Sequence, residues 1–552
     1  MKNTPLLFIL LGALLFCTVS SCREKRKPIG EKAVVTKPQE LKLTVTEVIE
    51  ASLEAAEENN GRVADIMLKS HTIVKQLYEQ NSYAPLWTND SKWKPKSDSL
   101  LQAIRQSRSY GLFPEDYYLA QLDTLHQKTV QDTSRENKLD ASLWAEADML
   151  LTSAFICLVN DLKIGRLVAD SVRQKDTTLT ITYYNQQLDS FRQKSTIDFA
   201  TALEPKHTGY LKLKAALQDF LIKANLRHYT SVSIKDTAQW ARQLQKRLRE
   251  DSIDVLNPAD SLELANGIRK WQVLKSIKSD GKISSSLFAR LNYTDADKFL
   301  RVAITLDRYK ILAPMPANYL WVNIPAYRLN VFENDTVVLT SKVVVGKPVT
   351  RTPQLTSIIS DMITYPLWHI PNSIIVKDIL PALKKDPGYL AKKGFSLVDS
   401  KHNEIDPFSV DWHKYTNGIP YTVIQGSGDA NALGVIKFNF PNKYDVYLHD
   451  TNQREFFSRS QRALSHGCVR VQAWDSLSRY LLIKDSAVIG AIPMDSLQTW
   501  LVRKEKHVIP LHKRVPLFIR YFTCEGIDGK LAIHDDIYGE DRRLRQTYFA
   551  TK

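Results

Sequence analysis

The sequence has few cysteines and few long apolar runs, and no residue type dominates it. Five cysteines in 552 residues are too few for a disulfide scaffold, and no CxxC pair of the kind that binds zinc is present. Apart from one run near the start, no stretch approaches 18 consecutive apolar residues, so we expect no transmembrane helix. The contents of hydrophobic residues (43%) and charged residues (24%) are those of globular proteins and exclude disorder over most of the chain.

The chain is basic, because 75 Lys and Arg against 60 Asp and Glu give a net charge of +15. Solubility alone can account for this excess, and so can a polyanionic partner such as an anionic membrane face or an acidic polymer. The charge is spread along the chain, and no basic stripe with interleaved aromatic residues is present. We therefore expect no nucleic-acid partner.

The N-terminus has the pattern of an export signal. Lys2 precedes an apolar run from Pro5 to Val19 that is too short to span a bilayer and suits a secretory signal peptide. The run ends in Val19-Ser-Ser-Cys22, which resembles a bacterial lipobox and predicts a signal peptide at 1–21 and a lipid on Cys22. The alternatives are an uncleaved anchor and a plain signal peptide with a chance cysteine.

The segment after Cys22 is charged, contains proline and lacks periodicity, which predicts a flexible tether over 22–62. The lipid would make the protein a membrane-anchored lipoprotein of the bacterial periplasm. Three cysteines then remain, Cys157, Cys468 and Cys524. Since an odd number cannot all pair within one chain, at least one thiol outside the cytoplasm invites a functional explanation.

Apolar residues recur at helical spacing from residue 63 to about residue 230. Leu150, Ala154 and Leu158 fall at i, i+4 and i+8, and runs of β-branched residues are rare. The pattern predicts a helical domain at 63–230 without chemistry of its own.

A smaller helical unit is predicted at 231–297. Two amphipathic helices precede a short third one. The Trp271-Gln272 pair, the Asp280-Gly281 turn and the closing Leu291-Asn292 resemble the small three-helix peptidoglycan-binding domain. The resemblance implies a module that binds glycan strands or serves as a degenerate spacer, although an arbitrary helical bundle would need similar core residues.

The period of the apolar residues changes to two after about residue 327, which indicates strands. The sequence predicts a hairpin with its turn at 333–336 and further strands at 361–368, 419–425, 435–440 and 445–449. Four prolines interrupt a loop-rich insertion at about 370–415, and such excursions often cover an active site. We therefore predict a mixed, mainly β domain at 298–510, followed by a C-terminal segment at 511–552.

One stretch carries the residues of a thiol nucleophile. His449 closes a predicted strand, and Cys468 lies 19 residues later in Ser-His-Gly-Cys-Val-Arg. A histidine within hydrogen-bond reach can take the thiol proton and later return it to a leaving amine. We predict that Cys468 begins a helix running through Leu482, whose N-terminus favours the thiolate. Gly467 would let two successive N–H groups face a developing oxyanion.

A histidine, fifteen residues and then Ser-His-Gly-Cys resemble the signature of the L,D-transpeptidase catalytic domain. The stretches 431–434, 437–441 and 447–451 are similar to the large, multi-domain branch of that family. So are Tyr83–Trp87 and Tyr110–Tyr117, which resemble its scaffold domain. The expected fold class is multi-domain α+β, with a helical scaffold domain, a three-helix peptidoglycan-binding-like domain and a mixed, mainly β catalytic domain with a capping insertion. The resemblance also suggests that the C-terminal segment returns to pack on the scaffold.

The resemblance implies acyl transfer on peptidoglycan stem peptides, donor and acceptor, without a metal or organic cofactor. Cys468 would attack the carbonyl that links meso-diaminopimelate to D-Ala and release D-Ala. The acyl group would pass to the side-chain amine of a second stem and form a 3-3 cross-link. A β-lactam of the carbapenem type is the expected inhibitor.

The resemblance also assigns roles to individual residues. His449 matches the general acid/base, and the backbone carbonyl of Asp450 would orient its ring. His466 matches a supporting position, and the N–H groups of Gly467 and Cys468 would form the oxyanion hole. Two further residues, Ser465 and Arg470, match substrate-binding positions.

Other interpretations share these residues. Hydrolysis of the same acyl-enzyme gives an L,D-carboxypeptidase, which the sequence does not separate from the transpeptidase. A wall-binding lipoprotein without activity and a cysteine peptidase acting on proteins are further alternatives. Cys468 could be a small buried residue or could bind zinc with His449 and His466. Arg470 could form a structural ion pair, and we interpret Cys157 and Cys524 as buried structural residues.

Overall fold

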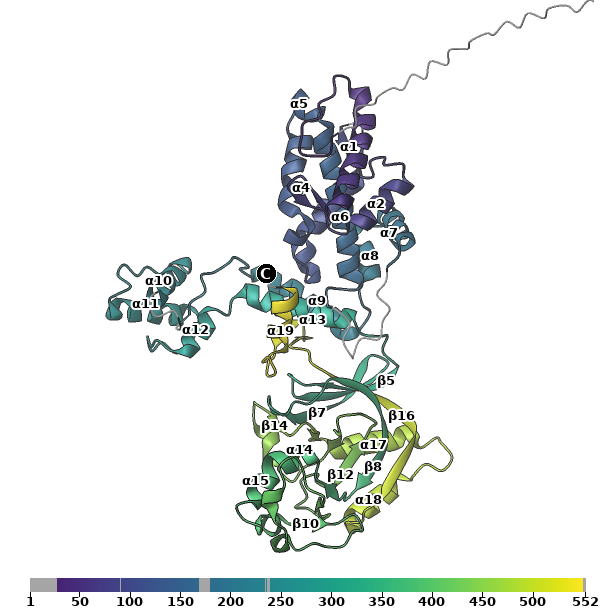
Figure 1. Ribbon diagram of the computed structural model, residues 1–552, viewed down its shortest axis with the longest axis vertical. Coiled ribbons are helices and arrows are strands. Elements are labelled where there is room, and N and C mark those ends of the chain that lie inside the picture. Colours follow the sequence, from purple (N-terminus) through teal and green to yellow (C-terminus); the bar gives the residue numbers. More distant parts are fainter. Residues whose placement is uncertain (1–26, 90, 168–178, 234, 236–238, 550–552) are drawn as a thin grey trace, which may run out of the picture. The chain divides into compact units, whose positions relative to one another are not determined.

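The computed structural model describes residues 27–89, 91–167, 179–233, 235 and 239–549 (Figure 1). The predicted signal peptide and Cys22 lie outside the described residues. The chain divides into two compact units. The first takes the residues up to Arg105 with Pro114–Val159 and Leu179–Thr196, and the second takes Gln106–Phe113, Asn160–Thr178 and Ile197–Lys552.

The first unit is built of helices and two short hairpins, as the scaffold prediction requires. Its helices are α1 (Pro38–Glu58), α2 (His71–Gln80), α3 (Pro95–Arg105), α4 (Leu119–His126), α5 (Arg135–Lys138), α6 (Ala141–Lys163, whose last turn belongs to the second unit) and α7 (Ile181–Gln193). Its strands are β1 (Arg62–Val63), β2 (Ile66–Met67), β3 (Thr88–Asn89) and β4 (Lys92–Trp93). Helix α6 is long and apolar enough to cross a membrane, but 83% of its most apolar window is buried, so it packs as a core helix.

Helix α1 shows that the prediction of a flexible tether over 22–62 was wrong from Pro38 onwards. Leu41, Val45 and Ile49 recur every four residues and are buried. This is a helical period, and Pro38 at the first helical position suits a helix start. The segment before the helix is charged and aperiodic, so the helical spacing of apolar residues that begins at Leu41 was not recognised.

A single buried carboxylate organises the segment that precedes β3. Asp148 of α6 accepts hydrogen bonds from the backbone N–H groups of Leu86 (2.7 Å), Trp87 (2.9 Å) and Thr88 (2.7 Å). The hydroxyls of Tyr78 (2.6 Å) and Thr88 (2.7 Å) also donate to it. Five donors compensate for the burial of the charge and fix the backbone of residues 86–88.

The second unit contains a connecting region formed by segments from both ends of the chain. It comprises α8 (Thr196–Leu203), α9 (Thr208–Lys223), α13 (Asp295–Lys310), α19 (Glu540–Tyr548) and the hairpin of β17 (Cys524–Ile527) and β18 (Lys530–Ile533). An ion pair of 3.0 Å joins Arg308 of α13 to Asp541 of α19. The C-terminal segment thus packs on α9, the last helix of the predicted scaffold, and on α13. The predicted scaffold boundary at 230 was therefore too late.

The small module has the three helices that the sequence predicts, α10 (Trp240–Glu250), α11 (Ser261–Leu274) and α12 (Ser285–Leu291), around a core of its own. Its signature residues hold it together. Gln272 bonds Asp280 (2.8 Å) and the N–H of Gly281 (2.9 Å), and the Asn292 amide bonds both backbone groups of Val232 (2.8 and 2.9 Å). Glycan binding by this module stays a prediction.

The catalytic part is a closed, mostly antiparallel sheet. Its strands follow the order β14 (Ala463–Ser465), β7 (Thr336–Gly346), β15 (Val469–Val471), β13 (Leu448–His449), β12 (Ile436–Asn439), β8 (Leu355–Thr364), β16 (Val508–Arg520), β5 (Asn318–Asn323) and β6 (Arg328–Glu333). Because β6 also pairs with β7, the sheet closes on itself. The predicted hairpin is β6 with β7. The predicted boundary at 510 cuts through β16 and was wrong.

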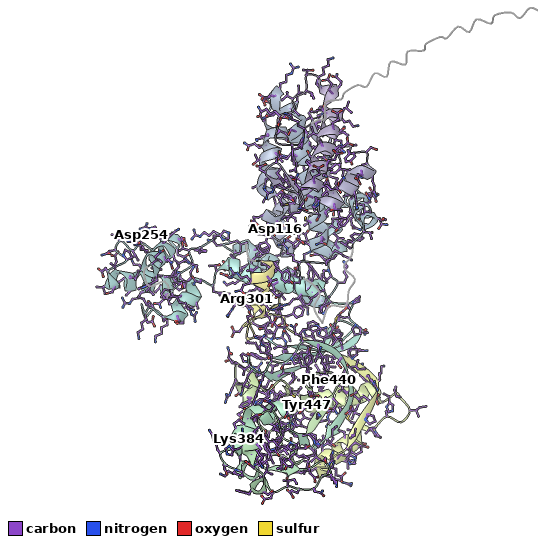
Figure 2. The ribbon with its side chains drawn as sticks, viewed as in Figure 1. Asp116, Asp254, Arg301, Lys384, Phe440 and Tyr447 are labelled. Carbon is purple, nitrogen blue, oxygen red and sulfur yellow. The ribbon has the colours of Figure 1, made fainter. Side chains whose placement is uncertain are left out.

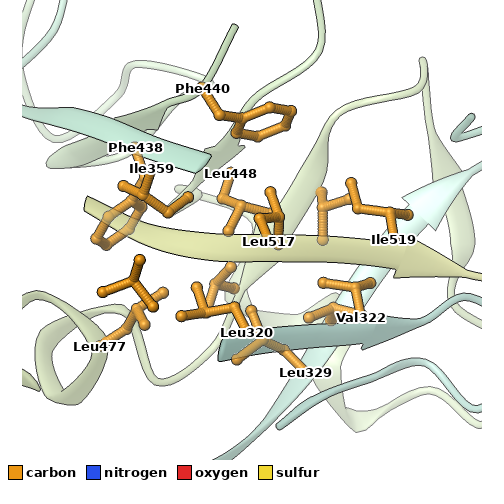
Figure 3. Close-up of a cluster of buried hydrophobic side chains, with 14 of the residues drawn as sticks. Leu320, Val322, Leu329, Ile359, Phe438, Phe440, Leu448, Leu477, Leu517 and Ile519 are labelled. Carbon is orange, nitrogen blue, oxygen red and sulfur yellow. The ribbon is translucent and has the colours of Figure 1, made fainter. Parts of the chain in front are cut away.

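Alternate residues of these strands fill one apolar core. Figure 3 shows Phe438, Leu448 and Leu517 meeting Ile359 and, from helix α17 (Trp474–Asp485), Leu477. Helix α18 (Met494–Arg503) adds Leu497 to the same core.

The insertion folds as a small layer with its own core. It contains β9 (Trp368–His369), α14 (Asn372–Ile374), a π-helical turn (Ile375–Ile379), α15 (Leu380–Leu383), α16 (Tyr389–Lys393), β10 (Phe395–Val398) and β11 (Thr422–Gln425). The sheet order is β10-β11-β9, and Leu383, Leu397 and Val423 are buried in its core. The insertion therefore runs from about 368 to 425, and the strand predicted at 419–425 belongs to it.

We expect replacement of Asp148 by asparagine to loosen the turn at residues 86–88. The amide cannot accept from all five donors, so the free energy of unfolding of the first unit should fall by about 3 kcal/mol. Hydrogen exchange of the Leu86, Trp87 and Thr88 amides in the full chain measures the effect. The matched control Asp189→Asn, at an exposed position of the same unit, should leave exchange unchanged. Equal exchange in both variants would contradict the assigned role.

Candidate active site

Parallel pairing of β13 with β15 brings His449 and Cys468 to one side of the sheet. The register sets Leu448 beside Val469 and His449 beside Arg470, so Cys468 lies in the turn that enters β15. The prediction that Cys468 begins a helix was wrong, because β15 follows it and α17 starts only at Trp474. Val469 and Val471 alternate into the buried core, a period of two that indicates a strand.

A cavity of about 330 Å³ opens over these two residues. Cys468, His449 and Arg470 line it from the sheet side. The insertion contributes Trp368 and the segment 371–374, and the loop before β13 contributes residues 443–447. The insertion therefore helps to form the site, as its predicted position suggested.

The imidazole of His449 is buried and held by the backbone. Its Nδ1 bonds the carbonyl oxygen of Asp450, as the resemblance implied. The Asp450 carboxylate is buried in turn and accepts from the N–H of Val435 (3.1 Å) and from Arg454 (2.9 Å). Gly434 leaves room for this carboxylate: it has a φ of +62°, and a Cβ there would lie 2.3 Å from Asp450 Oδ2.

The loop before Cys468 is closed by its own hydrogen bonds. The Ser465 hydroxyl donates to the Cys468 carbonyl (2.6 Å) and accepts from the Gly467 N–H (3.1 Å). The Thr352 hydroxyl donates to the Gly467 carbonyl (2.7 Å), and Gly467 has a φ of +126° that other residues rarely adopt. The Gly467 N–H is thus engaged within the loop and does not point at an oxyanion. Ser465 holds the turn, and its substrate-binding role stays a prediction.

Burial shifts the pKa values of the nucleophile and base candidates towards their neutral forms. Burial raises the pKa of the Cys468 thiol, although a hydrogen bond from Tyr447 and the charges of Lys437 and Arg470 oppose the rise. Burial, followed by the charge of Arg470, lowers the pKa of His449 to about 3. The thiolate expected from a helix N-terminus is therefore replaced by a thiol beside a neutral imidazole, which suits proton transfer during the attack itself.

Arg470 is fixed by neutral partners. Its Nη1 donates to the Gln453 side chain (2.7 Å) and to the Thr451 hydroxyl (3.2 Å), and its guanidinium lies 5.4 Å from the centre of the Phe456 ring. Among the residues that the structure describes, no carboxylate forms an ion pair with it, so its charge is available to the cavity.

His466 faces the insertion. Its Nε2 lies 2.8 Å from Asp378 Oδ2, and the side chain is half exposed. It ties the loop of Cys468 to the insertion, and its supporting role in the reaction stays a prediction. Across the described ranges, no group of three or more His, Cys, Asp and Glu side chains is placed to hold a metal ion. Cys524 is buried and Cys157 partly buried, and neither forms a disulfide.

Sequence reasoning missed three side chains that surround Cys468. Tyr447, Lys437 and Trp368 received no role from it. Tyr447 and Trp368 line the cavity together with Cys468, and the Tyr447 ring lies 5.7 Å from that of His449. The strand alternation that sets Tyr447 and His449 on one face was the available signal.

Comparison with known proteins agrees with this geometry. Residues 317–489 match the family model of the L,D-transpeptidase catalytic domain, YkuD, and residues 72–217 match that of a scaffold domain. A Haemophilus influenzae protein named "Putative L,D-transpeptidase" is 36% identical over 244 residues, which are 44% of this chain and 48% of that protein. The match thus spans about half the length of this curated relative. The chain carries a scaffold domain and, C-terminal to it, an L,D-transpeptidase catalytic domain.

Two solved structures are similar over 37% of this chain. The L,D-transpeptidase from Mycobacterium smegmatis is 13% identical with a TM-score of 0.18, and 58% of its chain is covered. The Ldtfm-avibactam carbamoyl enzyme is 12% identical with a TM-score of 0.15, and 49% of its chain is covered.

We expect alkylation of Cys468 by iodoacetamide to show an apparent pKa above that of a free cysteine. Burial favours the neutral thiol, so the rate should still rise steeply between pH 8 and pH 9. Mass spectrometry of the Cys468 peptide at a series of pH values measures this. A plateau already reached at pH 6 would indicate a thiolate–imidazolium pair and contradict the assignment.

We expect Gly434→Ala to displace the Asp450 carboxylate and, with it, the carbonyl that holds His449. The added Cβ overlaps Oδ2, and the positive φ disfavours alanine, so the free energy of unfolding should fall by at least about 2 kcal/mol. Thermal unfolding of the full chain measures the loss of stability, and the rate at which a carbapenem acylates Cys468 measures the effect on His449. Gly426→Ala is the matched control, since nothing lies within 4 Å of a Cβ at that position. Equal stability and equal acylation rates in Gly434→Ala and Gly426→Ala would refute the role of Gly434.

Proposed function

We propose that the protein is a peptidoglycan L,D-transpeptidase that forms 3-3 cross-links between stem peptides through a thioester on Cys468. The observation that carries the proposal is the cavity in which Cys468 and the carbonyl-held His449 lie together within an L,D-transpeptidase catalytic domain. We further propose that a lipid on Cys22 anchors the protein to a membrane in the bacterial periplasm.

The first half of the reaction forms the acyl-enzyme. The Cys468 sulfur attacks the carbonyl carbon between meso-diaminopimelate and D-Ala while its proton passes to His449. The Cys468 N–H donates to the tetrahedral oxyanion, whereas the Gly467 N–H is already bonded to the Ser465 hydroxyl. The carbon–nitrogen bond then breaks, and D-Ala leaves with the proton from His449.

The second half returns the thiol. The side-chain amine of a second stem attacks the thioester, His449 accepts its proton, and the sulfur leaves as the new amide forms. Arg470 presents an unpaired cation to the cavity, which fits a carboxylate of the stem peptide. Moving the thiol proton to His449 creates two charges from two neutral groups, so the site has to stabilise the negative charge of the sulfur while the proton moves.

Hydrolysis of the same thioester, the L,D-carboxypeptidase reaction, is the second candidate. It requires only that water reach Cys468 in place of an amine, and the cavity is open to solvent on the side of the exposed Tyr444. The two reactions share the acyl-enzyme and differ in their products.

Incubation of the chain from Arg23 onwards with disaccharide-tetrapeptide, followed by mass spectrometry, tests the proposal. We expect a dimer whose mass is that of two monomers less one D-Ala. For Cys468→Ala we expect the rate of dimer formation to fall by at least about a thousandfold. Cys157→Ala, in the first unit, is the matched control and should keep full activity.

The products separate the candidates. Tripeptide monomer without dimer would establish the carboxypeptidase instead. Unchanged tetrapeptide, with Cys468 also unreactive towards a carbapenem, would refute both enzyme functions and leave a wall-binding protein.

A further inference from the structure

Lys437 is a half-buried cation beside Cys468 that the proposed reaction does not use. It lies on β12 directly opposite His449 of β13. Its Nζ is 4.0 Å from the centre of the Tyr447 ring. Figure 2 marks Tyr447 within the catalytic part of the chain.

The burial of this ammonium is not balanced by a salt bridge. In the part of the chain that the structure describes, no carboxylate forms an ion pair with Lys437. Burial lowers its pKa, and the strongest opposing influence is a negative charge on Cys468, followed by that of Asp361. A buried cation without a partner costs free energy, so a site that keeps one is a candidate for function.

Tyr447 connects the cation to the sulfur. The ammonium contacts the face of its ring. The pairing of Leu448 with Val469 sets Tyr447 beside Cys468, and both side chains line the cavity. A cation on the ring face draws electron density from the phenol and makes its hydroxyl a stronger donor.

We propose that Lys437, acting through Tyr447, is a positioning residue that stabilises the negative charge of the Cys468 sulfur while its proton moves to His449. This role deepens the proposed function, and it rests on that function only for the identity of the substrate. It concerns the Cys468 sulfur and is independent of whether an amine or water accepts the acyl group. The other groups facing the sulfur come from the strands and loops around it: His449, Arg470, Asp445 and, in the same loop but bonded to Asp378, His466.

The chain offers a matched control for this pair. Lys393 of α16 lies over the ring of Tyr389 with its Nζ 6.0 Å from the ring centre. Lys393 is exposed, and neither residue lines the cavity of Cys468. Replacing Lys393 therefore removes a cation from a tyrosine ring and leaves the cavity and Tyr447 intact.

The test is the pH dependence of Cys468 alkylation by iodoacetamide in the full chain, read by mass spectrometry. We expect Lys437→Met to raise the apparent pKa of the thiol and to slow alkylation at pH 7 about three- to tenfold. Lys437→Arg should stay within about twofold of the wild type, since it keeps the cation. Tyr447→Phe should slow alkylation as well, and Lys393→Met should leave the profile unchanged.

Equal profiles for Lys437→Met and Lys393→Met would overturn the inference. If Lys437→Met does not fold, Tyr447→Phe decides, because it removes only a hydroxyl: an unchanged profile in that variant would overturn the inference too. No stem peptide enters this measurement. A failure to cross-link therefore counts against the proposed function alone, and an unchanged alkylation profile counts against the role of Lys437 alone.

Discussion

The site depends on the parallel pairing of β13 with β15. This contact sets His449 and Cys468, 19 residues apart in the chain, on neighbouring strands. A slip of one residue would turn His449 into the apolar core, because side chains alternate between the two faces of a strand. Such a slip is resisted from both sides, since β12 pairs with β13, β7 pairs with β15, and the sheet closes through β6 and β7. The barrel thus fixes the register on which the chemistry relies.

Burial shifts the pKa values of Cys468 and His449 towards the neutral forms, and the cations Arg470 and Lys437 lie nearby. Arg470 follows Cys468 on β15 and Lys437 lies on β12, on the other side of β13, and their charges oppose the effect of burial on the pKa of the thiol. A neutral thiol is less readily oxidised than a thiolate, because oxidation follows thiolate character. The cations become most favourable when the sulfur or the oxyanion carries charge, which is the condition for lowering a barrier rather than only binding a substrate.

Polar residues that look catalytic in the sequence divide into two groups in the structure. Ser465 and Gly467 bond each other and hold the turn that presents Cys468. His466 reaches outwards to Asp378 and joins that turn to the insertion. The same distinction applies to the small module, where Gln272 and Asn292 hold the helices together. A recurring sequence signature therefore records folding requirements as well as chemistry.

The sequence by itself determined the strands that alternate apolar and polar residues, the helices with apolar residues every three or four positions, and the thiol and imidazole of the site. These features are local, and residue type with spacing is sufficient to predict them. The tertiary structure decided that the segment after Cys468 is a strand, that α1 packs into the helical unit, and that α9 joins the C-terminal segment. Tertiary structure alone also set the protonation of Cys468 and His449 and placed Lys437 over Tyr447. Burial and contacts between distant strands control these properties, and neither is encoded in the spacing of neighbouring residues.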